Sequence, residues 1–119
     1  MDEEKFDFEG LIVYQKSLEY IDFVYLLTNR FPKNELFCLT DQFHRAVSSI
    51  CLNIAEGSGG SKAEFKHFLK IARRSARECV AITEVAFRQH YINQEEKEKS
   101  RRYCLELSKM LNGLIKSIK

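Results

Sequence analysis

The sequence predicts a single all-α domain over residues 1–119, folded as an up-down-up-down antiparallel four-helix bundle. Four segments space their apolar residues three or four positions apart, which places those residues on one side of a helix. No segment alternates apolar and polar residues for long enough to form a strand. The chain has only 5 Gly and 1 Pro, too few turn residues for a fold of many β-hairpins.

The four helices are expected at residues 9–30, 40–57, 61–90 and 93–118. Pro32 separates the first two helices because it lacks the N–H that a continuing helix needs. The glycine-rich residues 57–60 separate the second helix from the third. Ser61 and Glu64 form a capping box, in which each side chain accepts a hydrogen bond from the other residue's N–H. Asn93 is the expected N-cap of the fourth helix, and the helix dipole favours the two glutamates in its first turn.

Each helix is expected to bury one seam of apolar and small residues. In chain order, the seams are Leu11, Tyr14, Leu18, Ile21, Tyr25 and Thr28; Leu39, Phe43, Ala46, Ile50, Asn53 and Gly57; Phe65, Phe68, Ala72, Ser75, Cys79, Ile82 and Ala86; and Cys104, Leu107, Leu111, Leu114 and Ile118. Pairing the second and third seams in opposite directions places Phe43 opposite Ser75.

The first and second helices carry more apolar residues than one seam uses. Those outside the seams include Phe8, Ile12, Val13, Phe23, Val24, Leu26, Leu27, Val47, Cys51, Leu52 and Ile54. A small bundle has one core, so apolar residues around most of a helix imply a second buried face. We expect another copy of the chain to cover this face, which makes the protein a homo-oligomer.

The charge is nearly balanced overall but unevenly distributed. The net charge is +2, from 19 Lys and Arg and 17 Asp and Glu, so the total charge is no strong indication of a nucleic-acid or membrane partner. Residues 1–10 carry one Lys and five acidic residues, whereas residues 61–90 carry seven basic residues and three Glu. The positive charge is therefore concentrated in the second half of the chain.

The cysteines and the apolar runs indicate a cytoplasmic protein that has no membrane partner. Cys38, Cys51, Cys79 and Cys104 are too far apart in sequence for a zinc or redox CxxC pair. We expect buried free thiols in a reducing compartment. The N-terminus is acidic, unlike a signal peptide, and no apolar run approaches the roughly 20 residues that a membrane span needs.

Residue types that could support catalysis or metal binding are present but poorly placed. Asp41 with His44 and Glu64 with His67 form two acid-x-x-His motifs. They begin neighbouring antiparallel helices and so lie roughly 20 Å apart, too far for one di-iron centre. Ser48 has no orienting acid or oxyanion hole, and the glycine-rich loop lacks phosphate-loop spacing. We expect no catalytic residues, no metal and no cofactor.

A basic stripe on the third helix is the candidate nucleic-acid-binding site. It consists of Lys62, Lys66, Lys70, Arg73 and Arg77. These residues fall within an arc of about 80° on the side away from the seam. Such a stripe can follow phosphates. The alternative interpretation is an ordinary solvated face, neutralised by Glu64, Glu78 and Glu84 on the same helix.

Several strings resemble a bacterial four-helix-bundle family whose members are often encoded in intervening sequences of 23S rRNA genes. They are Phe31-Pro32-x-x-Glu35, Gln42-Phe-His-Arg45-Ala-Val-Ser-Ser-Ile50, Asn53-Ile-Ala-Glu-Gly57 and Glu64-Phe-x-x-Phe-Leu-x-Ile-Ala72-x-x-Ser75-x-x-Glu78. The related accessory variability proteins of diversity-generating retroelements share this fold. The resemblance implies ring-like homopentamers without enzymatic activity. It also implies that retroelement members bind nucleic acid and a reverse transcriptase through a basic surface.

The same resemblance assigns Arg45, Asn53, Glu56 and Gly57 to a structural motif. Asn53 is polar and lies on a seam, so it should be hydrogen-bonded. We expect it to bond near the Gly57 turn, and Glu56 to meet a basic partner or cap backbone N–H groups. The sequence leaves two functions open. The protein is either an oligomer that binds RNA or DNA through the basic stripe, or a protein-interaction scaffold, such as a reverse-transcriptase partner, that does not bind nucleic acid.

Overall fold

The computed structural model describes residues 4–119 of the chain, and within that range all regular structure is helical. The α-helices are α1 (Ile12–Thr28), α2 (Leu39–Ser58), α3 (Lys62–Arg88) and α4 (Gln94–Ser117), and the 3-10 helices are η1 (Asp7–Gly10) and η2 (Lys33–Glu35). The segment expected as one helix from residue 9 is divided at Leu11, whose extended backbone separates η1 from α1.

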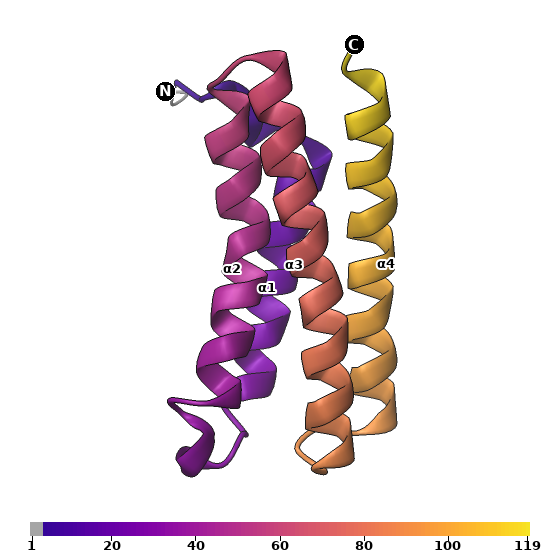
Figure 1. Cartoon of the computed structure of the whole chain (residues 1–119). Helices are drawn as coiled ribbons and strands as arrows, with labels where there is room; N and C mark the ends of the chain where they lie inside the picture. The colour runs from indigo at the N-terminus through magenta and orange to yellow at the C-terminus, as the bar shows by residue number, and fades with distance from the viewer. Residues whose placement is uncertain (1–3) are drawn as a thin grey trace.

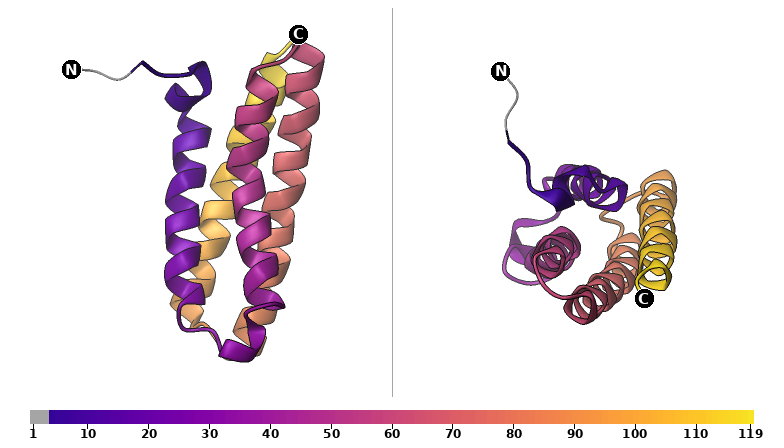
Figure 2. Two further views of the ribbon diagram at one scale, coloured as in Figure 1. Left: turned by 90° about the vertical axis from the view of Figure 1, so that its left-hand side faces the viewer. Right: turned by 90° about the horizontal axis from the view of Figure 1, so that it is seen from above.

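The four α-helices lie side by side around one core (Figure 1). In Figure 1, α1 ends and α2 begins at the lower end, α2 ends and α3 begins at the upper end, and α4 returns from the lower end. Both α2 and α4 pack against α1 and α3, and they occupy opposite corners when the bundle is seen from above (Figure 2). No helix in residues 4–119 is long and apolar enough to span a membrane.

The starts of α3 and α4 have the predicted caps. The Glu64 N–H donates to Ser61 Oγ over 3.2 Å, and the Ser61 N–H donates to Glu64 Oε1 over 2.9 Å. Asn93 and Glu96 make the same reciprocal pair, over 2.8 and 2.9 Å. These bonds confirm the predicted capping box at Ser61 and the predicted N-cap at Asn93, which the structure extends to a second capping box. Both satisfy N–H groups that the first turn leaves without helical partners.

The end of α3 is closed by a Schellman motif. The Tyr91 N–H donates to the Ala86 carbonyl over 2.9 Å, and the His90 N–H donates to the Phe87 carbonyl over 3.0 Å. This pattern places His90 in the left-handed region, with φ of 65°. Glycine usually occupies that position because a Cβ there is strained. The turn into α4 therefore carries backbone strain at His90.

The predicted seam of α1 is wrong. The structure buries Val13, Ser17, Tyr20, Val24, Leu27 and Thr28, and only Thr28 belongs to the predicted set. Leu18 and Tyr25 are instead 39% and 43% exposed. Both stripes of α1 have three-and-four spacing, so periodicity alone could not choose between them. As predicted, α1 has more apolar residues than the core uses: Ile12 and Leu26, which lie off the predicted seam, are exposed. Within that seam, Leu11, Tyr14 and Ile21 are partly buried against the core.

The predicted alignment of α2 and α3 is also wrong. Ser75 was expected to face Phe43, but its Oγ donates to Ser49 Oγ over 2.8 Å. Phe65 and Phe68 lie against Gly57. Because Gly57 has no side chain, the two phenylalanines occupy the space beside it, which fixes how far α3 lies along α2.

A chain of buried hydrogen bonds joins three helices in the core. Cys104 Sγ donates to the Tyr20 hydroxyl over 3.3 Å. The Tyr20 hydroxyl in turn lies 2.7 Å from Ser100 Oγ. Ser100 Oγ is 2.8 Å from Thr83 Oγ1, and Thr83 donates to the Cys79 carbonyl over 2.7 Å. Burial raises the pKa of the Cys104 thiol to about 11, so it stays protonated and can donate. Every hydroxyl in this chain therefore has a partner.

Candidate nucleic-acid interface

The basic stripe lies on the outer side of α3, along the edge next to α4. Lys62, Lys70 and Arg77 are exposed, whereas Lys66 and Arg73 are half-buried. At 1.5 Å per residue, the stripe extends about 22 Å along the helix from its first residue to its last. None of the five side chains forms an ion pair with any residue in the described range.

Arg73 differs from the other stripe residues because it also holds two helices together. Its Nη1 donates to Asn112 Oδ1 on α4 over 2.7 Å. The bond fixes the guanidinium near the groove between α3 and α4 and leaves its positive charge without a carboxylate partner. The sequence placed Arg73 on the stripe, but it could not reveal a partner that lies 39 residues away along the chain.

Two of the three glutamates expected to neutralise the stripe are occupied elsewhere. Hydrogen bonds from Ser61 lower the pKa of Glu64, whose carboxylate caps the start of α3. Glu84 pairs with Lys97 on α4 at 3.1 Å. Glu78 remains exposed on α3. These contacts weaken the interpretation of the stripe as a neutralised surface.

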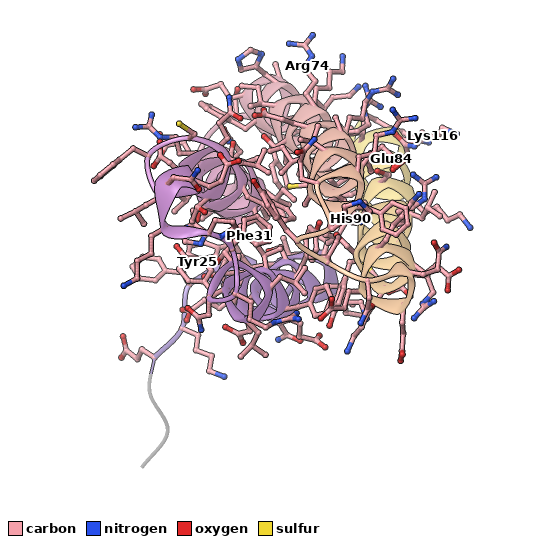
Figure 3. The ribbon with its side chains drawn as sticks, turned by 90° about the horizontal axis from the view of Figure 1, so that it is seen from below. Tyr25, Phe31, Arg74, Glu84, His90 and Lys116 are labelled. Atoms are coloured by element: carbon pink, nitrogen blue, oxygen red, sulfur yellow. The ribbon has the colours of Figure 1, made fainter. Side chains whose placement is uncertain are left out.

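The positive charge extends from α3 onto α4. Residues 62–119 contain 14 basic residues (Lys and Arg) and 7 acidic residues (Asp and Glu). Residues 1–61 contain 5 basic and 10 acidic residues. Arg101, Arg102, Lys109 and Lys116 are exposed on α4. Figure 3 shows Arg74 of α3 and Lys116 of α4 pointing away from the bundle. The predicted stripe does not include these α4 residues, although the composition of residues 101–119, with five basic residues and one Glu, indicates them.

Gly57 has a clear steric role in the motif that the resemblance assigned as structural. A Cβ at this position would lie 2.7 Å from the Cβ of Phe68 and 3.3 Å from the Cα of Phe65. Atoms do not approach so closely without displacement of the surrounding structure. Gly57 therefore allows α2 and α3 to pack closely just before the loop that joins them.

Asn53 is hydrogen-bonded as expected, but the expected place of that bond near the Gly57 turn is wrong, and the expected contact of Glu56 is not formed within residues 4–119. The Asn53 amide donates to the Ser49 carbonyl over 2.7 Å and to Ser49 Oγ over 2.8 Å, one turn before it on α2 and away from the Gly57 loop. Within residues 4–119, the exposed side chain of Glu56 has neither a hydrogen bond nor an ion pair. Arg45, the remaining motif residue, is exposed and pairs with Asp41 at 2.8 Å.

The two acid-x-x-His motifs are not assembled into one site. His44 Nε2 lies 2.7 Å from Thr28 Oγ1, and its ring stacks on Tyr25 with 4.0 Å between centroids. Burial lowers the pKa of His44, which favours the neutral ring. His67 contacts the edge of Phe68 on α3. No group of three or more His, Cys, Asp or Glu residues that could hold a metal ion occurs in the described part of the chain.

Comparisons with known proteins give one family and a similar solved structure. A family model described as 23S rRNA-intervening sequence protein matches residues 9–113. A crystal structure from Bacteroides thetaiotaomicron, described as a protein with unknown function from the S23 ribosomal protein family, is 32% identical with a TM-score of 0.79. The match covers 88% of this chain and 99% of that chain. No curated protein matches this chain.

Proposed function

This chain belongs to the 23S rRNA-intervening sequence protein family, and we propose that it is a non-enzymatic, self-associating protein that binds RNA or DNA through the basic stripe of α3. The observation that carries the proposal is the stripe itself: five cations along one helix edge, without ion-pair partners in residues 4–119. A row of unpaired cations is suited to a polyanion, because each phosphate contact releases a bound counterion.

The stripe supports binding to phosphates more than reading of bases. It contains no aromatic residue on which a base could stack. Backbone contacts position a nucleic acid but carry no sequence information directly. The expected interaction is therefore weak for one chain, dependent on salt and nearly independent of sequence. Structured RNA is a suitable probe because its phosphates are held in a regular array.

Self-association is the second part of the proposal. Ile12, Leu26 and Leu52 are 71%, 67% and 64% exposed on α1 and α2, and a second copy could cover them. The family resemblance implies five copies in a ring. Each copy adds a basic stripe, so one nucleic acid that reaches several stripes would bind more tightly through avidity.

An alternative function is a protein-interaction scaffold, such as a partner of a reverse transcriptase, whose stripe does not bind nucleic acid. Phe6 and Phe37 favour this alternative because they are 73% and 88% exposed. Large exposed aromatic residues are typical anchors of protein interfaces. Phe6 directly precedes η1 and Phe37 lies in the turn between η2 and α2, so both are outside the basic stripe.

The test compares two variants with the same change in charge. Lys70→Glu with Arg77→Glu alters exposed stripe residues and keeps the Arg73–Asn112 bond. Lys5→Glu with Lys33→Glu makes the same change at exposed positions in the acidic half. We expect the stripe variant to lose binding to a labelled RNA hairpin near ~50 mM salt, and the control to bind like the parent.

Fluorescence anisotropy measures binding, and light scattering during gel filtration checks that the oligomer mass is unchanged. The parent should also bind more weakly as salt increases. Equal binding by the stripe variant and the parent would contradict the assignment of the stripe. No binding by the parent at low salt would favour the scaffold.

A further inference from the structure

Three adjoining open depressions lie in a row along the outer side of α1 and α2. The first, of about 730 Å³, lies between the segment before α1, the end of α2 and the start of α3. The second, of about 440 Å³, shares Leu52 with the first, and the third, of about 540 Å³, shares Tyr25 with the second. We call this surface the α2 groove. The basic stripe of α3 does not line it.

The α2 groove is apolar and acidic. Phe6, Leu26 and Leu52 line it and are 73%, 67% and 64% exposed. Asp7, Asp22, Glu56 and Glu64 also line it, against Arg45 as the one full cation of the lining, and Arg45 is already paired with Asp41. Glu56 has no partner in residues 4–119. Its carboxylate is therefore free to meet a cation from outside the chain.

The outer face of α4 has the complementary character. Leu105 is 56% exposed, and the exposed Arg101, Arg102 and Lys109 lie within one turn of it. Residues 101–119 carry five basic residues and one Glu, and that glutamate, Glu106, is paired with Lys16. An apolar residue among cations fits a groove of apolar residues and carboxylates.

The two surfaces cannot meet within one chain. The helices α2 and α4 occupy opposite corners of the bundle and pack only through α1 and α3 (Figure 2). Contact between two α2 grooves would place acidic residues against acidic residues, and contact between two α4 faces would place cations together. Like charges across an interface are unfavourable. The charge pattern therefore favours contact of unlike surfaces.

We propose that the α2 groove of one copy receives the outer face of α4 from a second copy, with Leu52 and Leu105 central to the two surfaces and Glu56 facing the α4 cations. This inference rests on the self-association in the proposed function and specifies its surfaces. Such a head-to-tail contact leaves one free groove and one free α4 face on every pair. It therefore continues from copy to copy and ends only when a ring closes.

The test uses variants that each destroy one of the two surfaces. Leu52→Arg places a cation in the groove, and Leu105→Glu places an acid on the α4 face. Both side chains are largely exposed, so the fold should remain, which circular dichroism checks. Val85→Glu is the matched control because Val85 is a 46% exposed apolar residue on α3, outside both surfaces.

Light scattering should show an oligomer for the parent and for Val85→Glu, and the chain mass of 14.0 kDa for each of the other two variants alone. Mixing the two variants is the decisive measurement. Leu52→Arg keeps its α4 face and Leu105→Glu keeps its groove, so one contact remains possible between them. The equimolar mixture should therefore form pairs of twice 14.0 kDa, which neither variant forms alone.

The other outcomes overturn the proposal. If Leu105→Glu keeps the parent mass, the α4 face is not part of the contact; if Leu52→Arg keeps it, the groove is not. If both variants are single chains and the mixture does not pair, the contact is not head to tail. A parent that is itself a single chain refutes self-association altogether, whereas the other failures leave it standing.

Discussion

The same substitution should have opposite effects at Gly57 and Gly113. In Gly57→Ala, the new Cβ would lie 2.7 Å from the Phe68 Cβ and 3.1 Å from the ring of Phe65. At Gly113 on α4, a new Cβ meets nothing within 4 Å. Both glycines lie inside helices, where replacement by alanine gains roughly 0.5–1 kcal/mol from backbone entropy and helix propensity.

The structure sets the magnitude of the difference. Inserting a methyl group into a packed contact costs typically ~1–3 kcal/mol, because Phe68 must move at its Cβ, which its backbone fixes. After the helix gain is subtracted, Gly57→Ala should destabilise the protein by about 1 kcal/mol, within a range of roughly 0–2.5 kcal/mol. Gly113→Ala has no packing cost and should stabilise it by up to ~1 kcal/mol.

Thermal unfolding followed by circular dichroism measures both variants, at one protein concentration because self-association contributes to stability. At this chain length, 1 kcal/mol corresponds to about 4 °C in the melting temperature. The parent should melt between the two variants. If Gly57→Ala melts at or above the temperature of Gly113→Ala, the close approach of α2 and α3 at Gly57 is not a packing constraint, and the steric reasoning fails.

Two further predictions concern histidines. Because His90 has φ of 65° at the end of α3, His90→Gly should raise the free energy of unfolding by roughly 1 kcal/mol, measured by urea unfolding, whereas His90→Ala should give no such gain. Burial lowers the pKa of His44, so its stabilising contribution is present above its ordinary pKa of 6.5 and is lost as pH falls below that value towards the lowered pKa. The free energy of unfolding of the parent, measured by urea unfolding, should therefore fall on acidification through this range, and that of His44→Gln should fall less. An equal fall in both proteins would contradict the assignment of this pH dependence to His44.

The seams of α2, α3 and much of α4 were predictable from sequence because charged residues lie opposite the seam of each helix, although α2 also carries the exposed apolar Leu52. Phe43, Ala72 and Leu107 are buried as expected. The caps at Ser61 and Asn93 were predictable because they depend on residues three positions apart. Both kinds of signal are local, so they need no knowledge of how the helices pack.

The seam of α1 was not predictable in this way because its core side contains polar residues. Tyr20 and Ser17 are fully buried, and the hydroxyl of Tyr20 is satisfied by Ser100, 80 residues further along the chain. A tyrosine whose partner is unknown looks like a surface residue, whereas Leu18 looks like a core residue. The tertiary contact with α4 overrides the local pattern.

The candidate site likewise has features that depend on local sequence and features that depend on tertiary structure. The spacing of the basic stripe is local, and its exposed members Lys70 and Arg77 lie on the surface as the spacing implied. The contact of Arg73 with Asn112 and the lack of a partner for Glu56 in residues 4–119 depend on tertiary structure. The motif that contains Glu56 therefore combines a steric requirement at Gly57 with a carboxylate available to a partner.

The separation of charge along the chain links the two proposals and makes salt an ambiguous probe. Residues 1–61 are acidic and residues 62–119 are basic, so salt screens both the contact between copies and the contact with nucleic acid. Loss of RNA binding at high salt could then follow from loss of the oligomer and its avidity. The two effects separate only if mass and binding are measured in the same salt series. A parent oligomer that stays intact while RNA dissociates assigns the salt dependence to the basic stripe, because the groove and the α4 face are then still joined.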